Sequence, residues 1–235
     1  MIPLHDDNPT SINPYVTVIT IVLCALVFLW ELSLTGAQEK LIYAFSVIPA
    51  ALLRTQHLPP ELALIPPELT LVTSMFLHGG WMHLIGNMLY LWIFGNNVED
   101  AMGHVRFILF YIVCGVIAAL VHVWTNPASP IPTLGASGAI SGVLGAYLLL
   151  YPHARVMVFI PLGLLSRAVY LPAVMVLGFW FVFQIINSVV VSSEGGGVAW
   201  GAHIGGFIAG MVLIPIFRYK HVELFHRPNP THRRR

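Results

Sequence analysis

The sequence predicts an all-α integral membrane protein with six transmembrane helices, and composition is the first observation behind this prediction. The chain of 235 residues is 57% hydrophobic but only 9% charged, with a mean hydropathy of +0.80. A soluble domain carries about 25% charged residues, so ten acids and eleven bases are too few to cover a soluble protein of this length. The composition also excludes a disordered chain, and the net charge of +1 gives no indication of nucleic-acid binding.

The second observation is the number of apolar segments that could span a bilayer, which takes about 20 residues per helix. Six such segments cover residues 15–34, 82–98, 105–124, 136–151, 170–191 and 200–217. We expect a single domain over residues 1–235, ending in a basic tail over residues 218–235. The first segment has neither the basic start nor the cleavage site of a signal peptide. Cys24 and Cys114 lie in apolar runs and are expected to be packing residues.

A long first loop, residues 35–77, separates the first two spans. Its apolar stretches are interrupted by prolines at positions 49, 59, 60, 66 and 67, so none of them is long enough to cross a bilayer. We expect this loop to be associated with the membrane surface.

The third observation is the distribution of basic residues. With six spans, nine of the eleven Lys and Arg residues fall on the side that carries both termini, and only Lys40 and Arg54 fall on the other. Because basic residues concentrate on the cytoplasmic side of membrane proteins, both termini are predicted to be cytoplasmic. We expect a multi-pass protein of the cell membrane, the cytoplasmic membrane of a bacterium, with loops 35–77, 126–135 and 192–199 facing out.

Polar residues inside the predicted spans are costly unless they line a cavity, bond a neighbouring helix or take part in chemistry. His83 and Asn87 are four residues apart and share one face of the second span, shortly after His78. Three interpretations are open for these residues: an interhelical hydrogen bond, a metal site of His78 and His83, or a functional site.

Small and polar residues also open the fourth span, between Gly135 and Gly145. Gly138 lies in a stripe of small residues that is typical of close helix packing. Ser137 lies at the mouth of the helix, where backbone N–H groups are free. Ser141 lies one turn deeper, and we expect its hydroxyl to bond a backbone carbonyl.

A similar pattern opens the sixth span, where His203, Gly206 and Gly210 share one helix face. Glycines allow another helix to approach this face closely. A lone histidine on a helix is more often a packed core residue than a functional one. Here the glycines around it indicate contact with the small residues of the fourth span, which would bring His203 to Ser137.

The charged residues exclude several proteolytic mechanisms. The sequence has no His-Glu-x-x-His metal motif, no Asp within a span for an aspartyl pair, and no lysine beside Ser137. Asp100, which would be needed for a triad, is predicted on the opposite side of the membrane. The remaining arrangement is a dyad in which Ser137 attacks a carbonyl carbon and His203 transfers the proton. We expect His83, Asn87 and the Ser137 backbone N–H to stabilise the resulting oxyanion.

Three motifs, in this order along the chain, resemble those of the rhomboid intramembrane serine proteases. The family motifs are His-x-x-x-x-His-x-x-x-Asn, Gly-x-Ser-Gly and Ala-His-x-x-Gly-x-x-x-Gly. Each single motif is short, but the three together are specific. In this chain they are formed by His78, His83 and Asn87, by Gly135, Ser137 and Gly138, and by Ala202, His203, Gly206 and Gly210.

The resemblance implies a six-helix, rhomboid-like bundle that needs no metal or cofactor. It implies Ser137 as nucleophile, His203 as general base and acid, and His83 with Asn87 at the oxyanion. The implied partners are the lipid bilayer and single-span or other transmembrane proteins, which would be cleaved within or next to their spanning helix. In relatives the fifth helix and the loop after it, here residues 192–197, are thought to gate substrate entry.

Some positions depart from the family pattern. Leu69 and Thr70 stand where many relatives have Trp-Arg. Ser141 replaces an aromatic residue that stacks on the catalytic histidine, so His203 needs a different orienting group. No seventh span follows the sixth, as in the basic six-span bacterial form. Glu99 matches an acidic family position, and we expect it to bond loop backbone.

Two other functions are compatible with parts of this pattern. One is a catalytically silent rhomboid-like protein that binds membrane proteins, although such proteins lack the serine or the histidine, and Ser137 and His203 are both present. The other is a channel or transporter for a small solute, which would need broken-helix ion sites and two related halves that the sequence does not contain.

Overall fold

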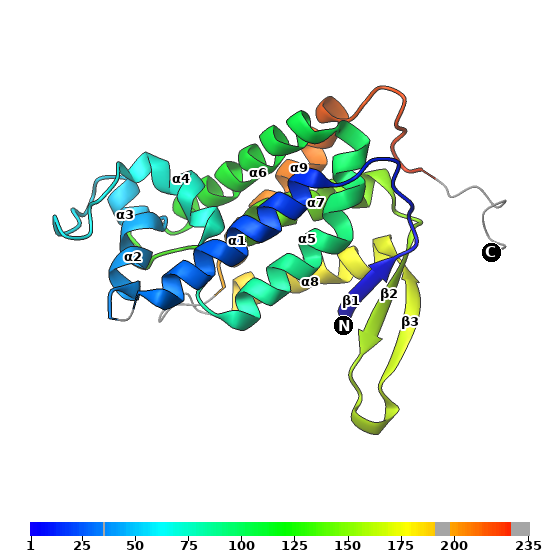
Figure 1. The fold of residues 1–235 in the computed structure, drawn as a ribbon, viewed down its shortest axis with the longest axis horizontal. Helices are drawn as coiled ribbons and strands as arrows, with labels where there is room; N and C mark the ends of the chain where they lie inside the picture. The colour runs from blue at the N-terminus through cyan, green and yellow to red at the C-terminus, as the bar shows by residue number, and fades with distance from the viewer. Residues whose placement is uncertain (35, 191–197, 227–235) are drawn as a thin grey trace.

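Helices make up most of the structure, a computed structural model that describes residues 1–34, 36–190 and 198–226 (Figure 1). Four of its helices are each long and apolar enough to cross a membrane: α1 (Tyr15–Ser33), α6 (His104–Thr125), α8 (Ala173–Val190) and α9 (Trp200–Phe217). Two more complete the bundle, the shorter apolar α7 (Ser137–Leu150) and the long α5 (Trp81–Met102). These helices match the six predicted spans, with ends that differ by a few residues.

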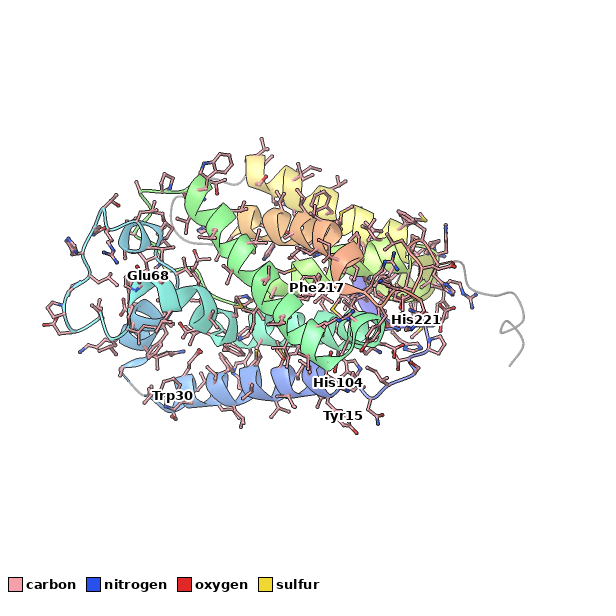
Figure 2. All side chains as sticks on the ribbon, turned by 90° about the horizontal axis from the view of Figure 1, so that it is seen from above. Tyr15, Trp30, Glu68, His104, Phe217 and His221 are labelled. Atoms are coloured by element: carbon pink, nitrogen blue, oxygen red, sulfur yellow. The ribbon has the colours of Figure 1, made fainter. Side chains whose placement is uncertain are left out.

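Helix α7 lies at the centre of the bundle. Ten of its fourteen residues are buried, and it packs against α5, α6 and α9. Helices α1 and α8 lie further out and expose apolar side chains, among them Leu26 and Phe179. Figure 2 shows side chains projecting along the whole of α1, from Tyr15 to Trp30. Apolar side chains on the outside of a helical bundle are typical of surfaces that face lipid.

Glycines on both sides allow α7 and α9 to approach closely. A Cβ atom at Gly206 would overlap the carbonyl oxygen of Gly138, and one at Gly210 would overlap that of Gly142. No other residue type leaves room for these contacts between two backbones. The glycines of the two motifs therefore bring the N-terminal ends of α7 and α9 together.

A three-stranded antiparallel sheet, absent from the predicted all-α fold, is added at one end of the bundle. It consists of β1 (Ile2–Asp6), β2 (Arg155–Ile160) and β3 (Arg167–Pro172), in the order β1-β2-β3. The β2–β3 hairpin, with a short 3₁₀ turn η3 (Gly163–Leu165) near its tip, projects away from the helices (Figure 1). Because β3 occupies residues 167–172, the fifth helix begins at Ala173 rather than at the predicted residue 170.

Two acidic side chains at the end of β1 hold this strand in place, one against α7 and one against β2. Asp6 is buried and accepts a 2.5 Å hydrogen bond from the hydroxyl of Tyr147 on α7. Burial raises the pKa of Asp6 to about 6, although the hydrogen bond from Tyr147 acts in the opposite direction. Asp7 forms an ion pair of 2.7 Å with Arg155 at the start of β2.

The first loop folds into short helices at the other end of the bundle. They are α2 (Gln38–Phe45), α3 (Pro49–Leu52), η1 (Pro67–Leu69), α4 (Thr70–Thr73) and η2 (Ser74–Phe76). A β-bridge between Val47 and Thr133 joins the loop to the segment before α7. The prolines thus prevent a long helix here, as the sequence predicts, and three of them lie at the start of a short helix or just before it.

The segment after α9 folds back onto the helix ends. The backbone N–H of Tyr219 bonds the carbonyl of Ala101, and that of Phe225 bonds the carbonyl of Leu149. The rest of the predicted basic tail, residues 227–235, lies outside the described residues, and so does the predicted gating loop at 192–197.

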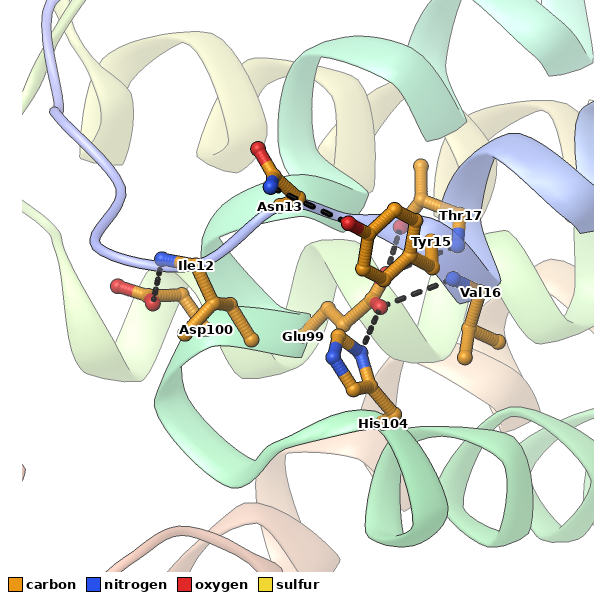
Figure 3. A network of polar contacts seen from close by, with 8 residues as sticks. All are labelled: Ile12, Asn13, Tyr15, Val16, Thr17, Glu99, Asp100 and His104. Atoms are coloured by element: carbon orange, nitrogen blue, oxygen red, sulfur yellow. Dashed lines mark hydrogen bonds and ion pairs between the residues drawn. The ribbon is translucent and has the colours of Figure 1, made fainter.

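Glu99 near the C-terminal end of α5 is fully buried and holds the first turn of α1 (Figure 3). Its carboxylate accepts hydrogen bonds from the backbone N–H groups of Val16, at 2.9 Å, and Thr17, at 2.8 Å. It also accepts hydrogen bonds from the Thr17 hydroxyl and from Nδ1 of His104. A carboxylate is favourable at a helix N-terminus, where backbone N–H groups have no intrahelical acceptor. The expected bonding of Glu99 to backbone is therefore present, but the backbone belongs to α1.

Candidate active site

Ser137 and His203 meet where α7 and α9 begin. Ser137 is the first residue of α7, and His203 lies in the first turn of α9. Nε2 of His203 lies 2.8 Å from Oγ of Ser137. The two residues are 66 positions apart in the sequence, and the glycine contacts between the helices bring them into hydrogen-bond distance.

A third side chain extends this contact to a chain of two hydrogen bonds. Oε1 of Gln184, from α8, lies 2.7 Å from Nδ1 of His203. The rings of Trp180 and Trp200 flank the imidazole, with centroids 6.0 and 6.2 Å away. Ser141, at the position where the family has an aromatic, bonds the Ser137 carbonyl through its hydroxyl at 2.6 Å, which confirms the expectation for that residue.

A cavity of about 590 Å³ opens beside Ser137 and His203. Its walls come from α5, α6, α7, the start of α9 and the segment before α7, and they also include His83 and Asn87. The four side chains predicted to form the dyad and the oxyanion site therefore line one cavity. A cavity of this size in an otherwise apolar bundle can hold water and a short segment of polypeptide.

Gly135 shapes the side of the cavity next to His83. The φ angle of Gly135 is +119°, a backbone conformation that other residues rarely adopt. A Cβ atom there would lie 2.7 Å from Nε2 of His83 and 3.7 Å from Nδ2 of Asn87. Only glycine therefore allows the backbone before Ser137 to lie against these two side chains. The backbone N–H of Gly135 is held by the carbonyl of Ser74, at 2.8 Å.

His78 lies just before α5, is fully buried and bonds Asn87. Its Nδ1 is 3.2 Å from the carbonyl oxygen of Phe76, which can only accept, so Nδ1 carries the proton. Nε2 is then free to accept a hydrogen bond from Nδ2 of Asn87, at 3.1 Å. Burial, together with the smaller effect of the nearby His83, lowers the pKa of His78 to about 4. Among the open interpretations of His78, the geometry favours a role in holding the amide of Asn87.

Glu31 supports this arrangement from α1. Its side chain is fully buried, and Oε1 accepts a hydrogen bond of 3.3 Å from the backbone N–H of His78. Glu31 and Gln184 are site residues that were not predicted from the sequence. A signal was present for each, because each is a strongly polar side chain inside an apolar span.

Comparison with known proteins identifies a family. A family model of the rhomboid domain matches residues 67–220. Among curated relatives, the yeast Rhomboid protein 1, mitochondrial, is 30% identical over 157 residues, which cover 63% of this chain and 41% of the relative. Rhomboid protease GluP of Bacillus subtilis is 36% identical over 140 residues, or 60% of this chain and 24% of the relative. The matched regions thus span less than half the length of these two relatives.

Proposed function

Because the chain belongs to the rhomboid family, we propose that it is an intramembrane serine endopeptidase. It cleaves transmembrane proteins within or next to their membrane-spanning helix. The observation that carries this proposal is the 2.8 Å distance between Oγ of Ser137 and Nε2 of His203 at the wall of a large cavity. A serine becomes a strong nucleophile only when a base accepts its proton, and the imidazole is within direct reach.

In the proposed reaction, Oγ of Ser137 forms a bond to the carbonyl carbon of the scissile peptide while its proton passes to Nε2 of His203. Collapse of the tetrahedral intermediate breaks the carbon–nitrogen bond, and His203 gives the proton to the leaving amine. Water, deprotonated by the same imidazole, then hydrolyses the acyl ester and restores Ser137.

The oxyanion of the intermediate needs hydrogen-bond donors. Asn87 and His83 line the same cavity as Ser137, and both approach the backbone at Gly135. The backbone N–H of Ser137 is a third donor, because the first N–H groups of a helix have no intrahelical acceptor. Removing one such donor typically lowers turnover by about 10²–10³-fold.

The proposed orientation follows from the distribution of basic residues. The termini lie in the cytoplasm, and the active-site cavity opens to the outside of a cell membrane, which we propose to be bacterial. Substrates are single-span or other transmembrane proteins that reach the cavity from the lipid bilayer.

Purified protein in proteoliposomes tests this proposal. The substrates are a panel of tagged single-span proteins with small residues at the outer end of the spanning helix. We expect cleavage by the wild type and none by Ser137→Ala or His203→Ala, with thermal unfolding unchanged in Ser137→Ala. A fluorophosphonate probe should label the wild type and not Ser137→Ala.

Cleavage by Ser137→Ala at the wild-type rate would overturn the proposal. A folded wild type that binds these substrates, cleaves none and is not labelled would also overturn it, in favour of a silent rhomboid-like binding protein.

A further inference from the structure

The polar contact between α8 and the dyad stands out because α8 is otherwise attached to the bundle by apolar residues. The buried residues of α8 are Ala173, Val176, Leu177 and Gln184. The first three lie in the first two turns, whereas Gln184 lies in the second half and is only 4% exposed. A buried amide in an apolar helix is costly unless it is hydrogen-bonded, and its partner here is His203.

The hydrogen bond determines which nitrogen of His203 carries the proton. Oε1 of an amide can only accept, so Nδ1 of the imidazole must donate to Gln184. In the neutral ring Nε2 then has a free lone pair, and this nitrogen faces Oγ of Ser137 at 2.8 Å. That tautomer is the one in which His203 can accept the serine proton. With the opposite tautomer, Nε2 would donate to Ser137 and could not act as a base.

We propose that Gln184 is a positioning residue for His203. This inference rests on the proposed function: Gln184 fixes the productive tautomer and the ring orientation, in the place of the acidic residue of a serine-protease triad. It also supplies the orienting group that Ser141 cannot supply, since the hydroxyl of Ser141 is bonded to backbone.

Because the orienting group comes from α8, the alignment of the dyad depends on where this helix lies. Beyond the hydrogen bond, α8 rests on α9 through aromatic contacts. At the middle of α8, Phe181 stacks on Phe207 at 4.4 Å between centroids, and in its second half Phe183 lies edge-on to Trp200 at 6.2 Å. Neighbouring side chains such as Val182 and Phe183 are exposed. Displacing this half of α8 by a few ångströms breaks the bond between Gln184 and His203, so the base is productive only while α8 packs against α9.

Three substitutions at position 184 separate orientation from packing. Gln184→Leu keeps the approximate size but removes the acceptor, and we expect kcat to fall about tenfold with KM unchanged. Gln184→Glu keeps an acceptor and adds a negative charge, which favours the protonated imidazole. It should retain activity and move the acidic limb of the pH–rate profile to higher pH. Gln184→Asn shortens the side chain, and its kcat should lie between those of Gln184→Leu and Gln184→Glu.

Asn187 on the same helix offers a matched control. Its amide bonds the carbonyl of Phe183 in its own helix, so Asn187→Leu should leave kcat and the pH profile unchanged. The other titratable groups that act on His203 are His83 of α5 and His122 of α6. Both are present in every variant, so a displaced acidic limb is due to residue 184.

Rates of fluorophosphonate labelling and cleavage, measured together in proteoliposomes, decide the outcome. Slower labelling and turnover in Gln184→Leu, restored by Gln184→Glu with a displaced acidic limb, support the proposal. Wild-type kinetics in Gln184→Leu, or equal losses in Gln184→Leu and Gln184→Glu, overturn it and leave the endopeptidase function intact. A wild type that neither cleaves nor labels instead overturns the endopeptidase function itself.

Discussion

Nδ2 of Asn87 donates a hydrogen bond to Nε2 of His78 across 3.1 Å, so a proposed oxyanion donor is held by a buried imidazole. One N–H of the amide is directed at His78, and the other remains available to the cavity that Asn87 lines. Glu31 and the carbonyl of Phe76 in turn hold His78, through its backbone N–H and its Nδ1. The orientation of Asn87 is therefore set by α1 and by the segment before α5.

Replacing His78 by phenylalanine should lower kcat while leaving KM close to the wild-type value. The ring volume is retained, but Asn87 loses its acceptor and samples other rotamers, so we expect a loss of about tenfold, less than removal of a donor itself would cost. Steady-state cleavage in proteoliposomes measures this effect. His57→Phe is the matched control, because His57 is exposed in the first loop. An unchanged kcat in His78→Phe would show that Asn87 does not depend on His78.

The lowered pKa of His78 should make the stability of the protein depend on pH. This pKa falls from 6.5 in the reference state to about 4 in the folded protein, chiefly because of burial. Between these pH values the folded protein binds fewer protons than the unfolded chain. The contribution of His78 is therefore complete above about pH 6.5 and is lost as the pH falls through 4. A difference of one pKa unit corresponds to 1.36 kcal/mol, so this protonation lowers the free energy of unfolding by about 3 kcal/mol.

Thermal unfolding in detergent between pH 7 and pH 4 measures this dependence. We expect the wild type to lose stability over this range more steeply than His78→Phe, which has no group to protonate at this position. If the melting temperatures of the two proteins fell equally with pH, protonation of His78 would not be the cause of the loss in stability.

Gly210 provides a test of the helix contact that brings the dyad together. A Cβ atom there would overlap the carbonyl of Gly142, so Gly210→Ala must separate α7 from α9. We expect a loss of about 1–3 kcal/mol in stability, as for other overpacked cores, and a lower kcat. Gly178→Ala is the control, since nothing lies within 4 Å of the position its Cβ would take. Equal melting temperatures for the two variants would argue against the tight contact.

The parts of this structure that the sequence predicted are those with a local or repeated signal. Long apolar runs identify the helices, and the glycines near His203 and Ser137 indicated that α7 and α9 meet. The sheet was not predicted, because β2 and β3 are apolar segments that adjoin or overlap predicted spans, and β1, which pairs with β2, is more than 140 residues away. Gln184 and Glu31 were missed for a related reason. Each is a single polar residue in an apolar helix, and its role depends on a partner that only the folded chain brings near.

Replacing Glu99 should lower the stability of the protein without changing its catalytic rate. The buried carboxylate of Glu99 satisfies two backbone N–H groups of α1, the Thr17 hydroxyl and His104 (Figure 3). None of these residues lines the cavity beside Ser137. Glu99→Ala leaves these donors without their acceptor, and we expect a loss of about 2–4 kcal/mol in stability.

The fraction of Glu99→Ala protein that stays folded should cleave substrate at the wild-type rate, because no group of the dyad or the proposed oxyanion site contacts Glu99. Cleavage normalised to the fraction of Ser137 labelled by fluorophosphonate measures this rate. Asp100→Ala is the control: Asp100 accepts from the exposed Ser11 and from Ile12, so its loss should cost less than that of Glu99. A fall in normalised turnover with an unchanged melting temperature would mean that Glu99 acts on the active site and not on the attachment of α1.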